Sequence, residues 1–265
     1  MMTQVTPIEP HVRTEIEGRL ANLEREEGVR YLMAVESGSR AWGFPSPDSD
    51  YDIRFLYVRP RRDYLALGKM RDVIERPIVD EIDLNGWDIR KALGLMLKHN
   101  AVVSEWMESP IRYIEDDPVV AELKALADRH FNPRGYARHY ANLGKGTVSR
   151  WFEDGENIPV KRYFYALRPA LSILALRTNP QERPPMEMRA LMQACDLAPT
   201  LVEQVEELIA LKGKTNEKGN AVRRPELEEL VHAELEHADD APERLDPETF
   251  KQEAEDLFLK LVDPQ

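Results

Sequence analysis

The stretch SGSRAWGFPSPDSDYDIRFLYV, residues 37–58, decides the fold because it joins a Gly-Ser turn to an apolar strand. The residues before it, VRYLMAVE, form a short apolar run rich in strand formers, and YDIRFLYV forms a second such run. Asp48, Asp50 and Asp52 occupy alternate positions that lead into the second run. Clustered carboxylates destabilise a fold unless a positive charge lies between them, so this spacing indicates a cation site.

The Gly-Ser turn and the aspartates together suggest one kind of chemistry. Gly38 lets the backbone approach a ligand closely, Ser39 adds a hydroxyl donor, and a helix that begins there directs its N–H groups at an anion. Asp50 and Asp52 lie two apart on a strand, so both project from one face. Such a pair binds a hard cation, Mg²⁺ (or Mn²⁺), which shares its ligands with substrate phosphates. The pattern therefore predicts a nucleotide–metal site and metal-assisted displacement at phosphorus.

A third carboxylate is needed to hold a second metal ion and to help deprotonate an attacking hydroxyl. The segment VDEIDL offers Asp80, Glu81 and Asp83. Strand alternation separates Asp80 from the other two. We choose Asp83 because it lies nearest the end of the strand, with Glu81 as the fallback.

The composition limits where the protein works and what it binds. The chain has 265 residues, 42% of them hydrophobic, and no apolar run approaches the roughly 20 residues of a membrane span. The N-terminus lacks the layout of a signal peptide, and the single Cys195 excludes an internal disulfide and a multi-cysteine zinc site. We expect a cytoplasmic protein without a membrane partner. The net charge of −12 argues against broad duplex binding, and the oligomeric state stays unknown.

Strand and helix patterns alternate in the first half of the chain, which favours an α/β or α+β sheet. Residues 71–84 read as a hairpin with its turn at Arg76-Pro77, and residues 86–100 as an amphipathic helix. After about Pro118 the strand signals fade. Helical patterns then follow at 118–130, 133–153, 159–177, 186–196, 199–213, 225–237 and 246–262.

Charge is unevenly distributed in this second half. Residues 131–170 contain 7 basic and 3 acidic residues together with 8 of the chain's 20 aromatic residues, whereas residues 221–265 contain 5 basic and 14 acidic residues. A basic and aromatic segment is typical of a surface that stacks bases and holds phosphates. The alternative, which we favour for most of these aromatics, is a pair of amphipathic helices with aromatic core residues.

Several basic residues are candidates for holding phosphates. Arg40 follows the Gly-Ser turn, where the alternative is a salt bridge with a neighbouring aspartate. Lys161, Tyr165 and Arg168 fall on one face of a helix, and that face would bind the nucleotide if it is directed at the aspartates. The alternative is that these cations pair with the chain's many acidic residues.

The spacing of Gly-Ser, ten residues and then Asp-x-Asp in an apolar strand resembles the DNA polymerase β-type nucleotidyltransferase superfamily. The longer run SGSRAWGFPSPDSDYDIRF, together with IDLNGWDIRKAL, EWMESP and KRYFYALRPAL, is similar to one branch of it, the RlaP-like predicted nucleotidyltransferases associated with RNA repair. The resemblance covers roughly residues 30–180, with weaker similarity beyond.

The resemblance implies an α+β fold, in which a small mixed β-sheet carries the catalytic carboxylates and an all-helical domain follows. We place the nucleotidyltransferase domain at residues 1–115 and the helical domain, on the acceptor side, at 116–265. By the resemblance, Gly38 and Ser39 bind the triphosphate, and Asp50 and Asp52 bind metal. Asp83 fits the third carboxylate less well, because other acids lie beside it.

The predicted activity is transfer of a nucleoside monophosphate from an NTP to a hydroxyl acceptor with release of pyrophosphate. The acceptor could be an RNA 3′ end, a protein hydroxyl or a small molecule, and the preferred NTP is open. Two alternatives remain: a nucleotide- or RNA-binding module with weak or no activity, and a toxin–antitoxin component that modifies or binds a protein.

Overall fold

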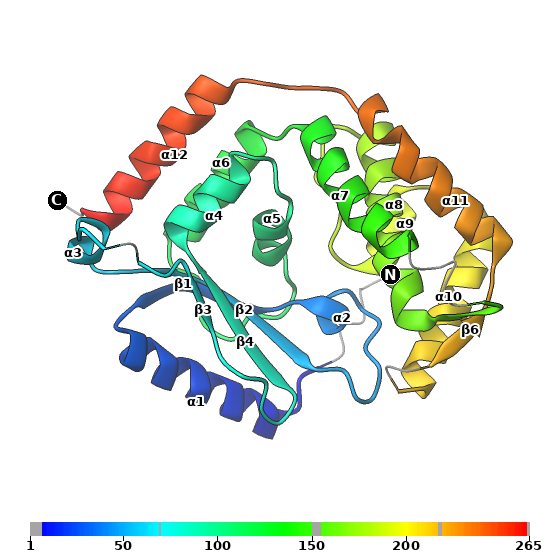
Figure 1. Cartoon of the computed structure of the whole chain (residues 1–265), viewed down its shortest axis with the longest axis horizontal. Helices are drawn as coiled ribbons and strands as arrows, with labels where there is room; N and C mark the ends of the chain where they lie inside the picture. Colours follow the sequence, from blue (N-terminus) through cyan, green and yellow to red (C-terminus); the bar gives the residue numbers. More distant parts are fainter. Residues whose placement is uncertain (1–6, 69, 150–154, 217–218, 264–265) are drawn as a thin grey trace.

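The computed structural model describes residues 7–68, 70–149, 155–216 and 219–263. It is a mixed α/β chain in which a small mixed sheet is accompanied by many helices, as expected for the α+β class (Figure 1). Within the described residues no helix is long and apolar enough to cross a membrane. The cytoplasmic location stays a prediction.

Four strands form the main sheet in the order β1-β2-β4-β3. The outer pairs, β1 with β2 and β3 with β4, are antiparallel, whereas the central pair, β2 with β4, is parallel. The sheet is therefore mixed, as predicted. The strands are β1 (Arg30–Glu36), β2 (Tyr51–Val58), β3 (Val73–Glu75) and β4 (Ile82–Asp88).

Helices cover both faces of this sheet (Figure 1). Successive side chains of β2 point to opposite faces of the sheet, because the side-chain pattern of a strand repeats every two residues. Ile53, Phe55 and Tyr57 pack with the first helix, while Leu56 and Val58 pack with helices on the opposite face. The helices of this part are α1 (Pro10–Glu27), the short α2 (Gly38–Ala41), α3 (Arg61–Tyr64), α4 (Ile89–Met96) and α5 (Val102–Met107).

The predicted helix over residues 86–100 begins three residues too early. Gly86 to Asp88 instead continue β4, because the parallel pairing with β2 extends to Tyr57 opposite Asp88. The side chain of Asp88 accepts a hydrogen bond from the backbone N–H of Arg90 and so caps α4. The long-range pairing with β2 thus overrides the helical pattern in these three residues.

The seven helical patterns predicted after Pro118 are confirmed, although residues 150–153 of the second lie outside the described residues. A two-stranded sheet and a short 3-10 helix accompany these helices. The strands are β5 (Asn157–Pro159) and β6 (Asn220–Val222), and the 3-10 helix is η2 (His237–Asp240). The helices are α6 (Val119–Arg129), α7 (Pro133–Val148), α8 (Val160–Thr178), α9 (Met188–Ala194), α10 (Pro199–Lys214), α11 (Pro225–Glu236) and α12 (Pro247–Val262).

The hydrophobic core around α8 unites α7 to α11, whereas α6 and α12 contribute to the core of the sheet. In Figure 1 the last helix, α12, accordingly lies over the sheet beside α4 and α6, far from α11. The division at residue 115 stays a prediction. One face of the sheet is therefore covered both by helices that precede residue 115 in the sequence and by helices that follow it.

Candidate functional site

Two carboxylates lie side by side where β2 and β4 begin. Asp52 and Asp83 are each the second residue of their strand, and the parallel register pairs them directly. Neighbouring strands are about 4.8 Å apart, and paired residues project from the same face. Burial raises the pKa of the Asp52 carboxyl, and the charges of Asp83 and Asp50 raise that pKa further. Asp83 and Asp50 are therefore both close enough to act on Asp52.

The other candidates for the third carboxylate lie elsewhere. Asp80 and Glu81 form the turn before β4, both with left-handed backbone φ values of 54° and 61°, and both are exposed. Asp80 is ion-paired with Arg19 of α1 at 2.6 Å. The geometry therefore favours Asp83 as the partner of Asp52.

An arginine bridges the two carboxylates. The Nη2 atom of Arg54 is 2.8 Å from Asp52 Oδ1 and also 2.8 Å from Asp83 Oδ2. Its Nη1 atom donates to the backbone carbonyls of Ile53 and Asp83. Arg54 lies two residues after Asp52 on β2, so strand alternation alone places both on one face. The sequence analysis missed Arg54, although this spacing could have revealed it.

The arrangement fits a divalent cation that draws further ligands from a substrate. Among the described residues, no group of three or more His, Cys, Asp or Glu side chains is arranged to hold a metal ion. The guanidinium of Arg54 nevertheless shows that a positive group fits between Asp52 and Asp83. Mg²⁺ usually takes one or two protein carboxylates and completes its shell with phosphate oxygens and water. Asp52 and Asp83 meet that requirement.

Gly38 makes room for the Asp52 carboxylate. Its backbone φ is +58°, and a Cβ atom added there would lie 1.9 Å from Asp52 Oδ2. A side chain at this position would overlap the carboxylate and strain the backbone. The backbone N–H of the preceding residue, Ser37, also donates to the carbonyl of Asp52 at 2.8 Å. The Gly-Ser turn is thus held directly against the acidic pair.

A buried glutamate supports Asp52 from the neighbouring strand. Glu36, the last residue of β1, is fully buried and accepts a hydrogen bond from the backbone N–H of Asp52 at 2.9 Å. It also accepts from the hydroxyl of Tyr113. Burial raises the pKa of Glu36 to about 7. The sequence analysis missed this residue, since a glutamate that ends an apolar run looks like an ordinary strand terminus.

The loop between Gly38 and β2 is held by serines, an arginine and a lysine. The Ser39 hydroxyl donates to Ser49 Oγ at 3.1 Å, and Arg40 donates to the carbonyls of Ser49 and Asp50 at 2.7 and 3.3 Å. Lys212 of α10 reaches Ser46 of the same loop. No sequence pattern points to Lys212, because it lies 166 residues further along the chain.

Helix α8 brings only part of its predicted face to the site. The charge of Lys161 lowers the pKa of Asp52, and its Nζ atom lies 5.8 Å from the centre of the half-exposed Tyr165 ring. Arg168, in contrast, is only 6% exposed and pairs with Glu105 at 3.2 Å. Its guanidinium also lies over the ring of Trp42, 4.3 Å from the centroid. Lys161 and Tyr165 therefore remain candidates for nucleotide binding, while Arg168 is directed into the interior.

The basic and aromatic segment at 131–170 is mostly internal. Five of its six described aromatic residues are buried, and Tyr165 is the exposed one. Arg134 and Arg138 form ion pairs with the acidic residues Glu243 and Asp239. Among the described residues, this finding supports the interpretation as core and paired surface. Arg150, Trp151 and Phe152 of the segment lie outside the described residues.

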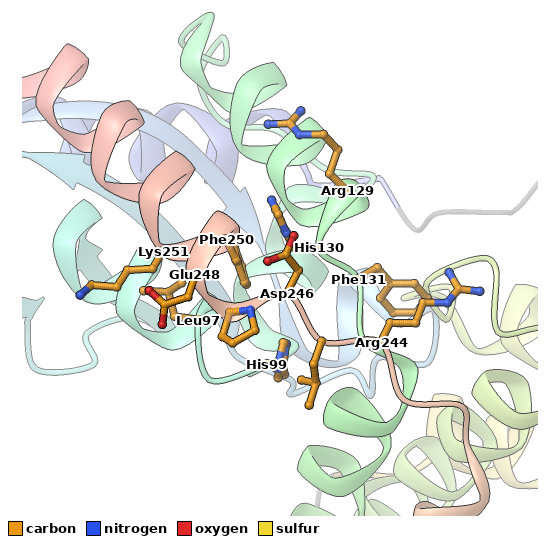
Figure 2. Close-up of a pocket in the computed structure, with 12 residues that line it drawn as sticks. Leu97, His99, Arg129, His130, Phe131, Arg244, Asp246, Glu248, Phe250 and Lys251 are labelled. Carbon is orange, nitrogen blue, oxygen red and sulfur yellow. The ribbon is translucent and has the colours of Figure 1, made fainter.

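A cavity of about 370 Å³ lies away from the carboxylates, where α12 meets the end of α6 (Figure 2). Its aromatic rings pack on one another: His130 stacks on Phe250 with centroids 4.6 Å apart. Arg129 at its rim pairs with Glu253. None of the predicted site residues lines it. The lining residues are Leu97, His99, Arg129, His130, Phe131, Arg244, Leu245, Asp246, Pro247, Glu248, Phe250 and Lys251.

Comparisons with known proteins relate the chain to a family. The model of RlaP, described as the RNA repair pathway DNA polymerase beta family, matches residues 12–260. The uncharacterized protein YcgL of Bacillus subtilis (strain 168) is 36% identical over 237 residues, which cover 89% of this chain and 90% of that protein. A nucleotidyltransferase-like protein from Exiguobacterium sibiricum 255-15 is 12% identical with a TM-score of 0.31, covering 94% of this chain and 80% of that one.

Proposed function

The chain belongs to the RNA repair pathway DNA polymerase beta family, and from that premise we propose that it is a metal-dependent nucleotidyltransferase. An acceptor hydroxyl, whose proton is removed with the help of Asp83, attacks the α-phosphorus of an NTP, the bond to the bridging oxygen of the leaving group breaks, and pyrophosphate departs. The observation that carries this proposal is the direct pairing of Asp52 with Asp83, with the backbone of Gly38 packed against Asp52.

Each residue has a distinct role in this proposal. Asp52 and Asp83 would hold Mg²⁺ or Mn²⁺, and the exposed Asp50 just before β2 would add a further carboxylate. When bound, the metal would neutralise phosphate charge and polarise the reacting phosphoryl group. Gly38 leaves space for the triphosphate, to which Ser39 donates a hydrogen bond. Asp83 orients the attacking hydroxyl.

Cations around the acidic pair would complete the nucleotide site. Lys161 is close enough to affect the pKa of Asp52, so its ammonium group can reach a phosphate bound there. Tyr165 beside it is half-exposed. Arg40 holds the carbonyls of the loop and keeps the Gly-Ser turn in register with β2.

The acceptor is the least constrained part of the proposal. The family's association with RNA repair favours an RNA hydroxyl, in the cytoplasm. A protein or small-molecule acceptor remains the alternative, because the predicted basic surface is largely paired with acidic residues.

The test is a labelling screen. The purified protein is incubated with each α-labelled NTP, Mg²⁺ or Mn²⁺, and either total RNA or a cell extract. We expect label on a macromolecule or small acceptor with wild-type protein and none with Asp52→Asn. Binding of Mg²⁺·NTP without any transfer would leave only the nucleotide-binding alternative. The absence of both binding and transfer would overturn the proposal.

A further inference from the structure

A chain of four polar side chains runs from the helical region to the Gly-Ser turn. Lys212 Nζ donates to Ser46 Oγ at 3.2 Å, Ser46 Oγ lies 2.8 Å from Ser49 Oγ, and Ser49 Oγ lies 3.1 Å from Ser39 Oγ. Lys212, Ser46 and Ser49 are at most 3% exposed. The ammonium group is thus buried, whereas Ser39 is the one member of the chain that is only partly buried.

The anchor of this chain is fixed in position. Lys212 is in the last turn of α10, whose residues Val205, Leu208 and Ile209 are part of the core around α8. The loop is held to the same core by Phe44, whose ring stacks on Phe164 with centroids 4.1 Å apart. The spacing between Lys212 and the loop is therefore set by packing rather than by the flexible lysine side chain.

The hydrogen-bonding capacity of the four groups allows two arrangements. An ammonium group only donates, so Ser46 Oγ must accept from Lys212. In the structure Ser39 donates inward to Ser49. In the second arrangement Ser46 donates to Ser49, Ser49 donates to Ser39, and the Ser39 proton is free to donate outward. Ser49 Oγ also accepts from the backbone N–H of Ser46 at 2.9 Å.

We propose that Lys212, Ser46 and Ser49 are positioning residues that turn the Ser39 hydroxyl toward a bound triphosphate. This inference rests on the proposed function. A phosphate oxygen accepts the Ser39 proton, and the three hydroxyls then all point from the buried cation to the anion. Such a chain is strengthened by the charges at its two ends, because each hydrogen bond polarises the next. The helical region thereby contributes to phosphate binding without touching the nucleotide.

The test is a double-mutant cycle on nucleotide affinity. The dissociation constant of Mg²⁺·NTP is measured by calorimetry, using the NTP that binds wild type most tightly. Lys212→Met and Ser39→Ala should each weaken binding by about five- to tenfold, the scale of one hydrogen bond to a charged group. In the Ser39→Ala background, Lys212→Met should have almost no further effect, since Lys212 acts through Ser39.

Two further variants keep the result interpretable. Ser46→Ala breaks the same chain with a small change in a buried side chain, and it should show the same coupling to Ser39 if Lys212→Met fails to fold. Lys214→Met is the matched control, because Lys214 is exposed at the end of the same helix. It should leave the affinity unchanged.

The outcomes are distinct. Additive losses from Lys212→Met and Ser39→Ala would overturn the proposed positioning role of Lys212, Ser46 and Ser49 while leaving the proposed function intact. An unchanged affinity in both Lys212→Met and Ser46→Ala would do the same. A wild-type protein that binds no Mg²⁺·NTP would overturn the proposed function, and the positioning role with it.

Discussion

Arg54 lies between two carboxylates at the edge of the sheet, whereas Arg168 lies against one carboxylate inside the helical region. The side chains of Arg54, Asp52 and Asp83 are each about one-fifth to one-quarter exposed, between 19% and 28%. Those of Arg168 and Glu105 are only 7% and 14% exposed. The two clusters contain the same chemical groups but differ in charge balance and in access to water.

The difference shows which cluster can accept a ligand. In the interior, one guanidinium matches one carboxylate, Tyr140 donates to Glu105, and Trp42 covers Arg168, although the buried Arg168 Nε has no hydrogen-bond partner. At the sheet edge, two carboxylates share a single guanidinium, a third carboxylate, Asp50, lies nearby, and Lys161 offsets part of their negative charge. Neighbouring carboxylates with access to solvent are what a cation site requires. Arg168 was predicted to bind the nucleotide because its spacing on the helix does not show which charged groups surround its side chain.

The largest effect is expected from Gly38→Ala, which tests whether the edge cluster depends on the Gly-Ser turn. The new Cβ would overlap Asp52 Oδ2, so we expect nucleotide transfer to fall by at least about a thousandfold, beyond the scale of one lost electrostatic contact. Gly28→Ala is the control. Gly28 has a similar φ of 60° but nothing within 4 Å of its added Cβ. It should lose about 1 kcal/mol of stability and keep its activity, as measured by urea unfolding and the labelling assay.

The next largest effect is expected from Arg168→Met, which tests the interior pair. Leaving Glu105 buried without its partner should lower the free energy of unfolding by about 3 kcal/mol, measured by urea denaturation. The double variant Arg168→Met/Glu105→Gln should recover most of that loss. The affinity for Mg²⁺·NTP should not change. Weaker nucleotide binding by a folded Arg168→Met protein would place Arg168 back in the nucleotide site.

Asp83→Asn tests the chemical role of the edge cluster. Because Asp83 is proposed to act mainly as the reaction proceeds, kcat should fall by about a hundredfold while nucleotide affinity changes little. The measurement is steady-state kinetics with the acceptor found in the labelling screen. Glu81→Gln, an exposed acid two residues earlier, is the control and should behave like wild type. The reverse result would exchange the roles of these two acids.

The smallest effect is expected from Arg54→Gln. Removing the guanidinium leaves the charges of Asp52 and Asp83 uncompensated, so Mn²⁺ without nucleotide should bind about fivefold more tightly, on the scale of a partly exposed ion pair. Electron paramagnetic resonance of free Mn²⁺ measures this directly. Weaker Mn²⁺ binding would mean that Arg54 holds the carboxylates in position rather than competing with the metal.

Local patterns in the sequence determined much of this protein. The need for Gly38, the strand containing Asp52 and the seven later helices all follow from residue types at short spacing, because backbone sterics and hydrophobic periodicity act over a few residues. The mixed sheet followed by helices came from the resemblance to a family. The strand–helix boundary at Asp88 was misplaced, since pairing with β2 extends β4 past its own local signal.

The tertiary structure alone decided which charged groups meet. Asp83 is the neighbour of Asp52 through the parallel register of β2 and β4, and Lys212 reaches Ser46 only because α10 packs beside the loop. Likewise, burial against Trp42 and Glu105 turned Arg168 away from the site. Charged side chains are long and numerous, so the sequence alone is compatible with several alternative ion pairs of similar interaction energy. The packing of the apolar core fixes the distances, and those distances select the partner.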